Sequence, residues 1–131
     1  MKRIMVVAGF VLLAACGDIA EEESVPAGPP MEVTAQELFN AYQANEAAAQ
    51  QQYGGRLLMV SGTVAGIELD FMDDPVVQLL TSNEFMNAQA ALSDASKPQA
   101  ASLSKGQQIK VLCKGVSEVV GVPMLSDCDI Q

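Results

Sequence analysis

Residues 107–130 read QQIKVLCKGVSEVVGVPMLSDCDI, and this stretch decides the fold. Apolar and polar residues alternate through most of it, which is the two-residue period of a half-buried β-strand. Gly121 interrupts the alternation with a residue that tolerates a positive φ, and Pro123 follows at a position where a strand can begin. We therefore predict two strands, residues 107–116 and 122–130, joined as an antiparallel hairpin.

The register of this hairpin brings two cysteines together. A four-residue loop at 119–122 places Cys113 directly opposite Cys128. Opposed residues point to one face with Cβ atoms about 4.5–5.5 Å apart, a separation that can relax to disulfide geometry. A redox-active or metal-binding thiol pair is the rival interpretation, but it lacks CxxC spacing, histidine and a nearby base. We expect a structural Cys113–Cys128 disulfide in an oxidising compartment.

Shorter segments with the same period lie upstream of the hairpin. Three further strands are predicted, and they cover residues 56–69, 76–80 and 85–92. Gly62 and Gly66 in the first of them indicate a bent or bulged strand. Residues 93–104 contain a proline and many Ala and Ser residues, and we predict a loop with a short helical turn there.

A helix is predicted ahead of the strands, over residues 34–53. Thr34 and Glu37 have the spacing of a capping box, the interior is rich in good helix formers, and Gly54-Gly55 ends the helix. One helix followed by five short strands, with a helical connection between the third and fourth, is the order of an OB-fold. The fold class is therefore mainly β with one N-terminal helix (α+β), a five-stranded OB-like barrel packed by the helix at residues 34–53.

The first 15 residues have the features of a secretory signal peptide. Lys2 and Arg3 form a positive start, and residues 4–15 are an uncharged, mostly apolar run too short to span a bilayer. The run ends in Leu13-Ala14-Ala15-Cys16-Gly17, which resembles the lipobox of bacterial lipoproteins. That resemblance implies cleavage before Cys16 and a diacylglycerol on its thiol. An ordinary secretory signal with a coincidental cysteine is the alternative.

The sequence divides into three parts. Residues 1–15 are the predicted lipoprotein signal peptide. Residues 16–33 form an acidic, Pro-rich tether that we expect to be disordered, because acid, Pro and Gly cannot bury enough apolar area to order themselves. Residues 34–131 form the OB-like domain.

Composition argues against several classes of function. The chain has no histidine, which removes the commonest general base and the commonest metal ligand. Seven basic and 16 acidic residues give a net charge of −9, and loss of Lys2 and Arg3 with the signal lowers it to −11, with Arg56 as the remaining arginine. Nucleic-acid binders need clustered Lys and Arg. We expect no enzyme, no catalytic residue, no cofactor, no metal and no nucleic-acid partner.

Two further patterns have a structural and a functional interpretation. Acidic residues gather around the predicted first turn, at Glu68, Asp70, Asp73 and Asp74. They suit a solvated turn, with a calcium site as the alternative. Asn45-Glu46 lies within the predicted helix, where Asn is a middling-to-poor helix former, so we expect a hydrogen bond from helix to barrel, with a ligand contact as the alternative. Tyr42 and Tyr53 are expected to pack the helix on the barrel.

The order and spacing of several motifs resemble one family, the tRNA_anti-like OB domains of lipoproteins and exported proteins. The matching motifs are Tyr42-x-x-Asn45-Glu46-x-x-Ala49-x-x-x-Tyr53-x-Gly55, Val60-x-Gly62-x-Val64-x-x-Ile67, Leu103-x-Lys105-Gly106-Gln107-x-Ile109-x-Val111-x-Cys113-x-Gly115 and Leu125-x-x-Cys128-x-Ile130. The resemblance covers residues 38–131 and implies the fold. It implies no catalytic residue.

The expected function is that of a cell-envelope lipoprotein. Lipid on Cys16 would hold it to a membrane, facing the periplasm or the exterior, and the barrel would act as a non-enzymatic interaction module. Its partner would be an envelope protein or a small ligand. The alternative is an OB-fold protein that binds oligosaccharide or nucleic acid, since such barrels offer that face.

Overall fold

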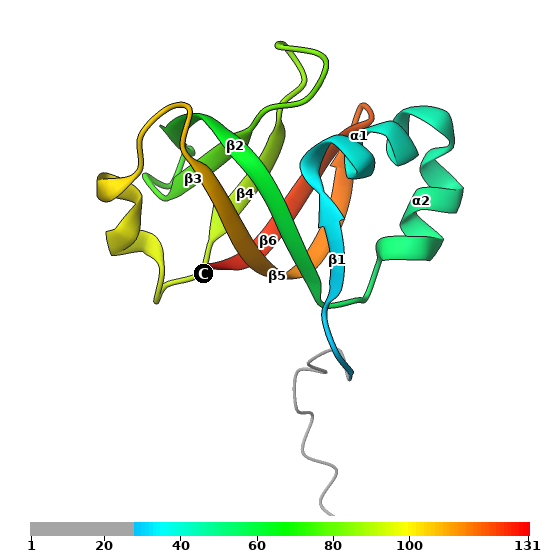
Figure 1. Ribbon diagram of the computed structural model, residues 1–131, viewed down its shortest axis with the longest axis horizontal. Coiled ribbons are helices and arrows are strands. Elements are labelled where there is room, and N and C mark those ends of the chain that lie inside the picture. Colours follow the sequence, from blue (N-terminus) through cyan, green and yellow to red (C-terminus); the bar gives the residue numbers. More distant parts are fainter. Residues whose placement is uncertain (1–27) are drawn as a thin grey trace, which may run out of the picture.

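The computed structural model describes residues 28–131, which form a β-barrel with helices packed against one end (Figure 1). The predicted signal peptide, Cys16 and the tether up to residue 27 lie outside the described residues. The elements follow in the order β1 (Met31–Thr34), α1 (Ala35–Ala44), α2 (Glu46–Tyr53), β2 (Leu58–Leu69), β3 (Pro75–Leu79), β4 (Ala88–Leu92), the 3-10 helix η1 (Lys97–Ser102), β5 (Gln108–Val119) and β6 (Val122–Ile130).

Five of the strands close into the barrel. β2 pairs antiparallel with β5 through its first half and with β3 through its second half. β3 pairs antiparallel with β4, β4 runs parallel to β6, and β6 pairs antiparallel with β5. The order β2-β3-β4-β6-β5, closing again on β2, is that of an OB-fold, so the predicted five-stranded barrel is confirmed.

A sixth strand precedes the barrel. β1 pairs parallel with the start of β2, from Met31 opposite Leu58 to Thr34 opposite Ser61, and Val33 is buried. The predicted tether included residues 31–33, and this boundary is wrong, because these residues belong to β1. Four residues after a proline pair carry no clear periodicity, and their strand forms because β2 offers an edge to pair with.

The N-terminal helical segment is two helices, where the sequence predicted one. Thr34 caps α1, and its capping box with Glu37 is present as predicted. α1 ends at Ala44 because Asn45 is extended, with φ −164°. The Asn45 side chain accepts a hydrogen bond from Ala48 N–H and so caps α2. The expected bond from Asn45 to the barrel is therefore wrong, since asparagine is a better cap than helix interior residue.

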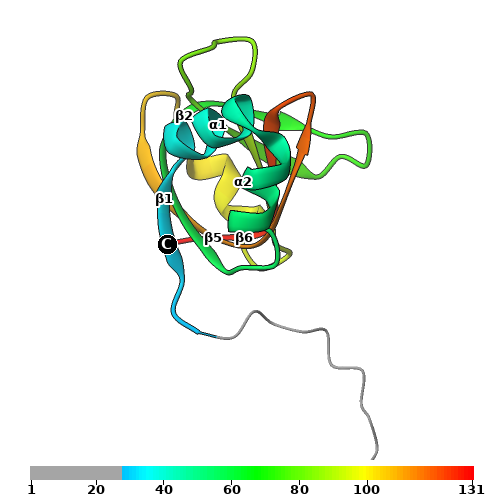
Figure 2. The same cartoon turned by 90° about the vertical axis from the view of Figure 1, so that its right-hand side faces the viewer.

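Two glutamines connect these helices to the barrel. Gln43 Nε2 donates to the carbonyl of Gly121 at 3.1 Å, and Gln50 Nε2 donates to the carbonyl of Val116 at 3.1 Å. Tyr42 is buried and its hydroxyl donates to Gln50 Oε1 at 2.7 Å. Burial, Glu118 and then Tyr53 raise the pKa of Tyr42. Figure 2 shows α1 and α2 covering this end of the barrel.

The core is a stack of inward-facing aliphatic residues. One row crosses four strands in register, from Val77 through Ala90 and Leu125 to Val116, and all four are buried. β2 supplies Val60 and Val64 and then shifts register between Val64 and Gly66, which is the bulge that its glycines predicted. Because aromatic residues are few, small aliphatic side chains in register fill the barrel.

The β5–β6 hairpin has the predicted register. Cys113 pairs with Cys128 and a disulfide of 2.08 Å joins their sulfur atoms inside the core. The turn is shorter than predicted: Val119 pairs with Val122, leaving Val120 and Gly121 as a two-residue turn. Their φ values, 53° and 76°, are both positive, as a type I′ hairpin turn requires.

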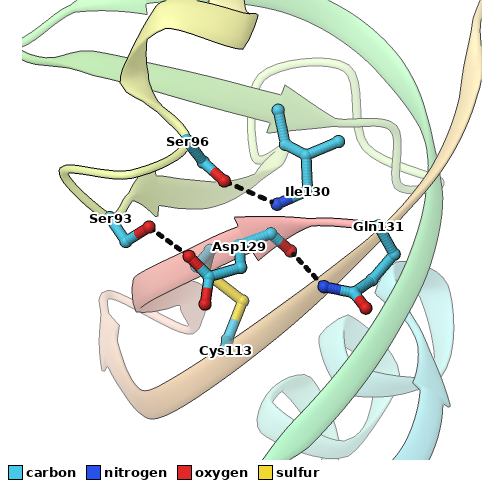
Figure 3. The surroundings of a disulfide bond; sticks show 7 residues. Ser93, Ser96, Cys113, Asp129, Ile130 and Gln131 are labelled. Atoms are coloured by element: carbon cyan, nitrogen blue, oxygen red, sulfur yellow. Dashed lines mark hydrogen bonds between the residues drawn. A yellow bond between two sulfur atoms is a disulfide. The ribbon is translucent and has the colours of Figure 1, made fainter.

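The segment before η1 is attached to β6 beside this disulfide (Figure 3). The Ser93 hydroxyl donates to the Asp129 carboxylate, and Ser93 N–H donates to the carbonyl of Cys128 at 2.8 Å. Ser96, which is buried, accepts from Ile130 N–H at 3.0 Å. The barrel's last strand is therefore held by side chains as well as by its neighbours. Over residues 28–131, no helix is long and apolar enough to cross a membrane.

Candidate ligand-binding site

A hollow of about 700 Å³ lies on the outer surface of β2 and β5, beside the start of α1. Most of its lining side chains carry amides or hydroxyls, and these are Thr34, Gln36, Ser61, Thr63, Gln107, Gln108 and Gln131. Leu80, Ile109 and Ile130 add apolar surface. Lys110 is the one charged side chain in this lining.

The strand register orders these residues into rows. Thr34, Ser61 and Lys110 lie in line across β1, β2 and β5. The next row along β2 places Thr63 opposite Gln108. Residues two apart on a strand share a face, so these rows form one polar floor on the outside of the barrel.

The hollow exists because two strands share one edge of β2. β1 pairs with residues 58–61 of that edge and β3 pairs with residues 64–69. α1 begins at the gap between β1 and β3, and in this gap Leu80 N–H donates to the carbonyl of Thr63 at 2.9 Å. Gly62 permits this close packing, since a Cβ at its position would lie 3.2 Å from Leu79 Cβ and 3.3 Å from Ala35 Cβ.

A smaller hollow of about 290 Å³ continues from the first one and shares Thr34, Ser61 and Lys110. Its lining adds the carboxylates of Glu32 and Glu37, so one end of the combined surface is acidic. Amides and hydroxyls can both donate and accept hydrogen bonds, which suits a neutral polar ligand. Single strands of nucleic acid need stacking aromatics in a positive groove, and the described residues that line these hollows supply neither.

The face that OB-folds use for ligands lies on β3 and β4, their second and third strands. Its outward residues also form a register row, and these are Gln78, Gln89, Met124 and Ser117. Val76 lies opposite Ala91 in the next row. Lys105 reaches the edge of this face beside Gly66: the Lys105 Cε lies 3.8 Å from the position that a Cβ on Gly66 would occupy. The face is therefore almost neutral.

The acidic β2–β3 turn is organised by hydrogen bonds. Asp70 Oδ1 accepts from Met72 N–H at 2.8 Å and from Asp74 N–H at 3.0 Å, so the predicted turn is present and Asp70, rather than Asp73-Asp74-Pro75, supplies its side-chain hydrogen bonds. Asp74 also pairs with Lys97 of η1 at 2.8 Å. Among residues 28–131, no three acidic or cysteine side chains converge to hold a metal ion.

Lys97 joins this turn to the segment before η1. Its ammonium also lies 2.7 Å from Asp94. Hydrogen bonding to Asp74, and next to Asp94, raises the pKa of Lys97. The same ammonium holds the pKa of Asp94 below its usual range.

The structure separates the residues that the sequence singled out. Cys113 and Cys128 lie in the core, and Asn45 lies in the helical segment, whereas the hollow is built from Ser61, Thr63 and Lys110. Ser61, Thr63 and Lys110 were not predicted as site residues, because each looks like any other solvent-facing residue of an alternating strand. Their only sequence signal is polarity on the solvent side of β2 and β5.

A family model matches residues 2–129 of this sequence, and its family is tRNA_anti-like. The chain belongs to the tRNA_anti-like family. The resemblance on which the fold was predicted is thereby confirmed. Among curated proteins, none matches this tRNA_anti-like chain in sequence.

The tRNA_anti-like barrel is also similar to a solved structure. That protein is described as a "putative nucleic acid-binding lipoprotein from Klebsiella pneumoniae subsp. pneumoniae MGH 78578", with a TM-score of 0.57 and 15% sequence identity. The match covers 78% of this chain and 92% of the other. At this identity the similarity establishes the shared fold.

Proposed function

We propose that this protein is a lipid-anchored lipoprotein of the cell envelope whose OB barrel is a non-catalytic interaction module. The observation that carries the proposal is the pairing of a lipobox-like sequence ending at Cys16 with a small barrel that has an almost neutral ligand face. The family and the similar solved structure both belong to binding-type OB-folds. The description of that structure as a lipoprotein supports the envelope location.

The anchoring part of the proposal rests on the N-terminal sequence. Cleavage before Cys16 leaves an acidic, Pro-rich segment ahead of β1, which starts at Met31. Diacylglycerol on the thiol and an amide-linked acyl chain such as palmitate would give stable attachment, because two or more chains hold a protein where one chain binds reversibly. The anchored barrel would face the periplasm or the exterior.

The interaction part rests on the surface of the barrel. The hollow beside α1 offers amides and hydroxyls, and the face of β3 and β4 offers Gln78, Gln89 and Met124. Such surfaces fit a protein or a neutral small ligand. General acid–base chemistry needs a positioned titratable group, and Lys110 is the one charged side chain in the lining of the larger hollow.

Nucleic-acid binding is the second candidate, because the similar solved structure is described in those words. The charge of this chain disfavours it. Phosphate binding needs several Lys or Arg residues on one surface, whereas Lys105 is the cation that reaches the β3–β4 face and Lys110 the one in the larger hollow. Oligosaccharide binding uses the same OB face and is a further alternative.

Mass spectrometry of the protein purified from its native membrane tests the anchoring directly. The mature chain is expected to begin at Cys16 and to carry diacylglycerol and one amide-linked acyl chain. A Cys16→Ser variant, as the matched control, should remain unprocessed or leave the membrane fraction. An unmodified N-terminus at another residue would overturn the proposal.

A further inference from the structure

We propose that the β2–β3 loop is a preformed docking tip, which inserts Phe71 and Met72 into an apolar pocket of a partner protein bordered by Lys and Arg. This inference rests on the proposed function and names the site and the class of partner. In Figure 2 the loop is the green projection at the right of the barrel. Phe71 is 97% exposed and Met72 is 69% exposed, and Leu69 at the end of β2 is 65% exposed.

Three large apolar side chains at one tip are unusual on a protein with so few aromatic residues. Phe71 touches so little of its own protein that it adds almost nothing to the core. Clustered exposed apolar residues are typical of interaction sites, and buried aromatic anchors supply much of the binding energy in protein interfaces.

The loop holds these side chains in place before any partner arrives. Asp70 N–H donates to the carbonyl of Asp74 at 2.9 Å, and Asp73 N–H donates to the carbonyl of Asp70 at 3.0 Å. The Asp70 carboxylate accepts two more backbone N–H groups, and Lys97 fixes Asp74 to η1. A loop already ordered in its binding shape loses less entropy when it docks.

Charge identifies the chemistry of the partner. Residues 68–75 contain Glu68, Asp70, Asp73 and Asp74 and no basic residue. Of these, Asp74 is neutralised by Lys97, and the others leave the tip negative. A partner pocket bordered by Lys and Arg would complement the tip and speed association, whereas anionic lipid head groups would repel it.

The tip also lies away from the end of β2 at which β1 pairs. Met31, the first residue of β1, pairs with Leu58 at the start of β2. The tip follows Leu69, 12 residues along the same strand. An extended strand of that length spans up to about 40 Å, so the tip lies at the end of β2 remote from Met31.

Photo-crosslinking in living cells of the native host, with the full lipidated chain, tests the proposal. Benzoylphenylalanine replaces Phe71 in one strain and Phe85 in a matched one. Phe85 is the natural control, because it is 88% exposed on the loop after β3, at the opposite end of that strand. We expect one discrete protein adduct from position 71 and none from position 85.

The protein found in that adduct is then purified and titrated against the chain. Phe71→Ser should raise the Kd at least about tenfold and Phe85→Ser should leave it unchanged, because a buried aromatic anchor dominates such an interface. Raising NaCl from about 50 mM to 500 mM should weaken binding. Equal affinity of the Phe71→Ser variant, or no adduct at position 71, would overturn the proposal.

Two other outcomes would also overturn it in favour of a different occupant. Adducts between two copies of this chain would mean self-association. Co-sedimentation of the lipid-free chain with phosphatidylglycerol–phosphatidylethanolamine vesicles, lost in Phe71→Ser, would mean that the tip inserts into a membrane. Neither result depends on acylation of Cys16. Failure of the docking proposal can therefore be distinguished from failure of the proposed lipid anchor, which mass spectrometry tests.

Discussion

Two hairpins of the barrel, β5–β6 and β2–β3, present exposed apolar residues at their tips but are stabilised in different ways. The β5–β6 hairpin is paired up to a two-residue turn and is crosslinked by Cys113–Cys128 within the core. The β2–β3 hairpin has no covalent link, and its longer loop is held by the Asp70 carboxylate and by Lys97. The β5–β6 hairpin therefore stabilises the barrel, whereas the polar side chains of the β2–β3 hairpin keep an apolar loop ordered.

The largest expected effect is loss of the disulfide. Cys113→Ser with Cys128→Ser should lower the free energy of unfolding by about 3 kcal/mol, because the closed loop is near 15 residues. Urea denaturation of the oxidised protein measures it. Phe71→Ser at the other tip is the control and should leave the midpoint unchanged. Two free thiols in the oxidised, denatured wild type would contradict the assigned bridge.

Removing the Asp70 carboxylate tests the other hairpin. Asp70→Ala should lower the free energy of unfolding by about 1–2 kcal/mol, because Met72 N–H and Asp74 N–H lose a charged acceptor. Asp73→Asn is the matched control, since residue 73 has φ 62° and asparagine tolerates that conformation. Chemical denaturation compares the two variants, and hydrogen exchange should report faster exchange within the loop of Asp70→Ala. An equal effect of both changes would contradict the role given to Asp70.

The β5–β6 turn should become more stable by substitution. Val120 is 82% exposed and has φ 53°, a conformation that β-branched residues rarely adopt. Val120→Asn should raise the free energy of unfolding by up to about 1 kcal/mol, because Asn-Gly is the favoured type I′ turn. Val119→Asn, in the strand, should not stabilise. A lower melting temperature for Val120→Asn would show that the valine packs in a way the exposure does not suggest.

The smallest effect concerns Lys97. The folded pKa of Asp94 is lowered, so its pairing stabilises the fold above about pH 4 and this contribution is lost as the pH falls further. The folded pKa of Lys97 is raised, so its contribution is present below about pH 10.5 and lost as the pH rises through the folded value. Lys97→Met should be slightly less stable than wild type at pH 7, and the difference should shrink as the pH falls from about 4 towards 3 and Asp94 becomes protonated. Urea midpoints across that range provide the check, and a difference that persists at low pH would contradict it.

The parts of the fold that could be predicted from the sequence are those that depend on local signals. The register of β5–β6 was predictable because its alternation, Gly121 and Pro123 are local signals. The turn over residues 70–75 was predictable for the same reason, although the part of Asp70 as its hydrogen-bond acceptor was not. β1 was missed because its strand depends on the edge of β2, which is far away in the sequence.

The candidate site could not be predicted in the same way. Its floor joins Ser61 and Lys110 from strands about 50 residues apart, and its wall is the start of α1, which Thr34 caps. Each lining residue is an ordinary polar position on its own strand. Only the packing of α1 in the gap between β1 and β3 makes them a concave surface.

The most direct test of the account asks whether this OB barrel binds nucleic acid. Fluorescence anisotropy of labelled single-stranded DNA and RNA of about 20 nucleotides, titrated with the chain lacking its signal peptide at physiological salt, measures this. We expect no binding at micromolar protein, because the chain carries a net charge of −11 without Lys2 and Arg3 and its β3–β4 face is almost neutral. Micromolar affinity that falls steeply with added salt would contradict it.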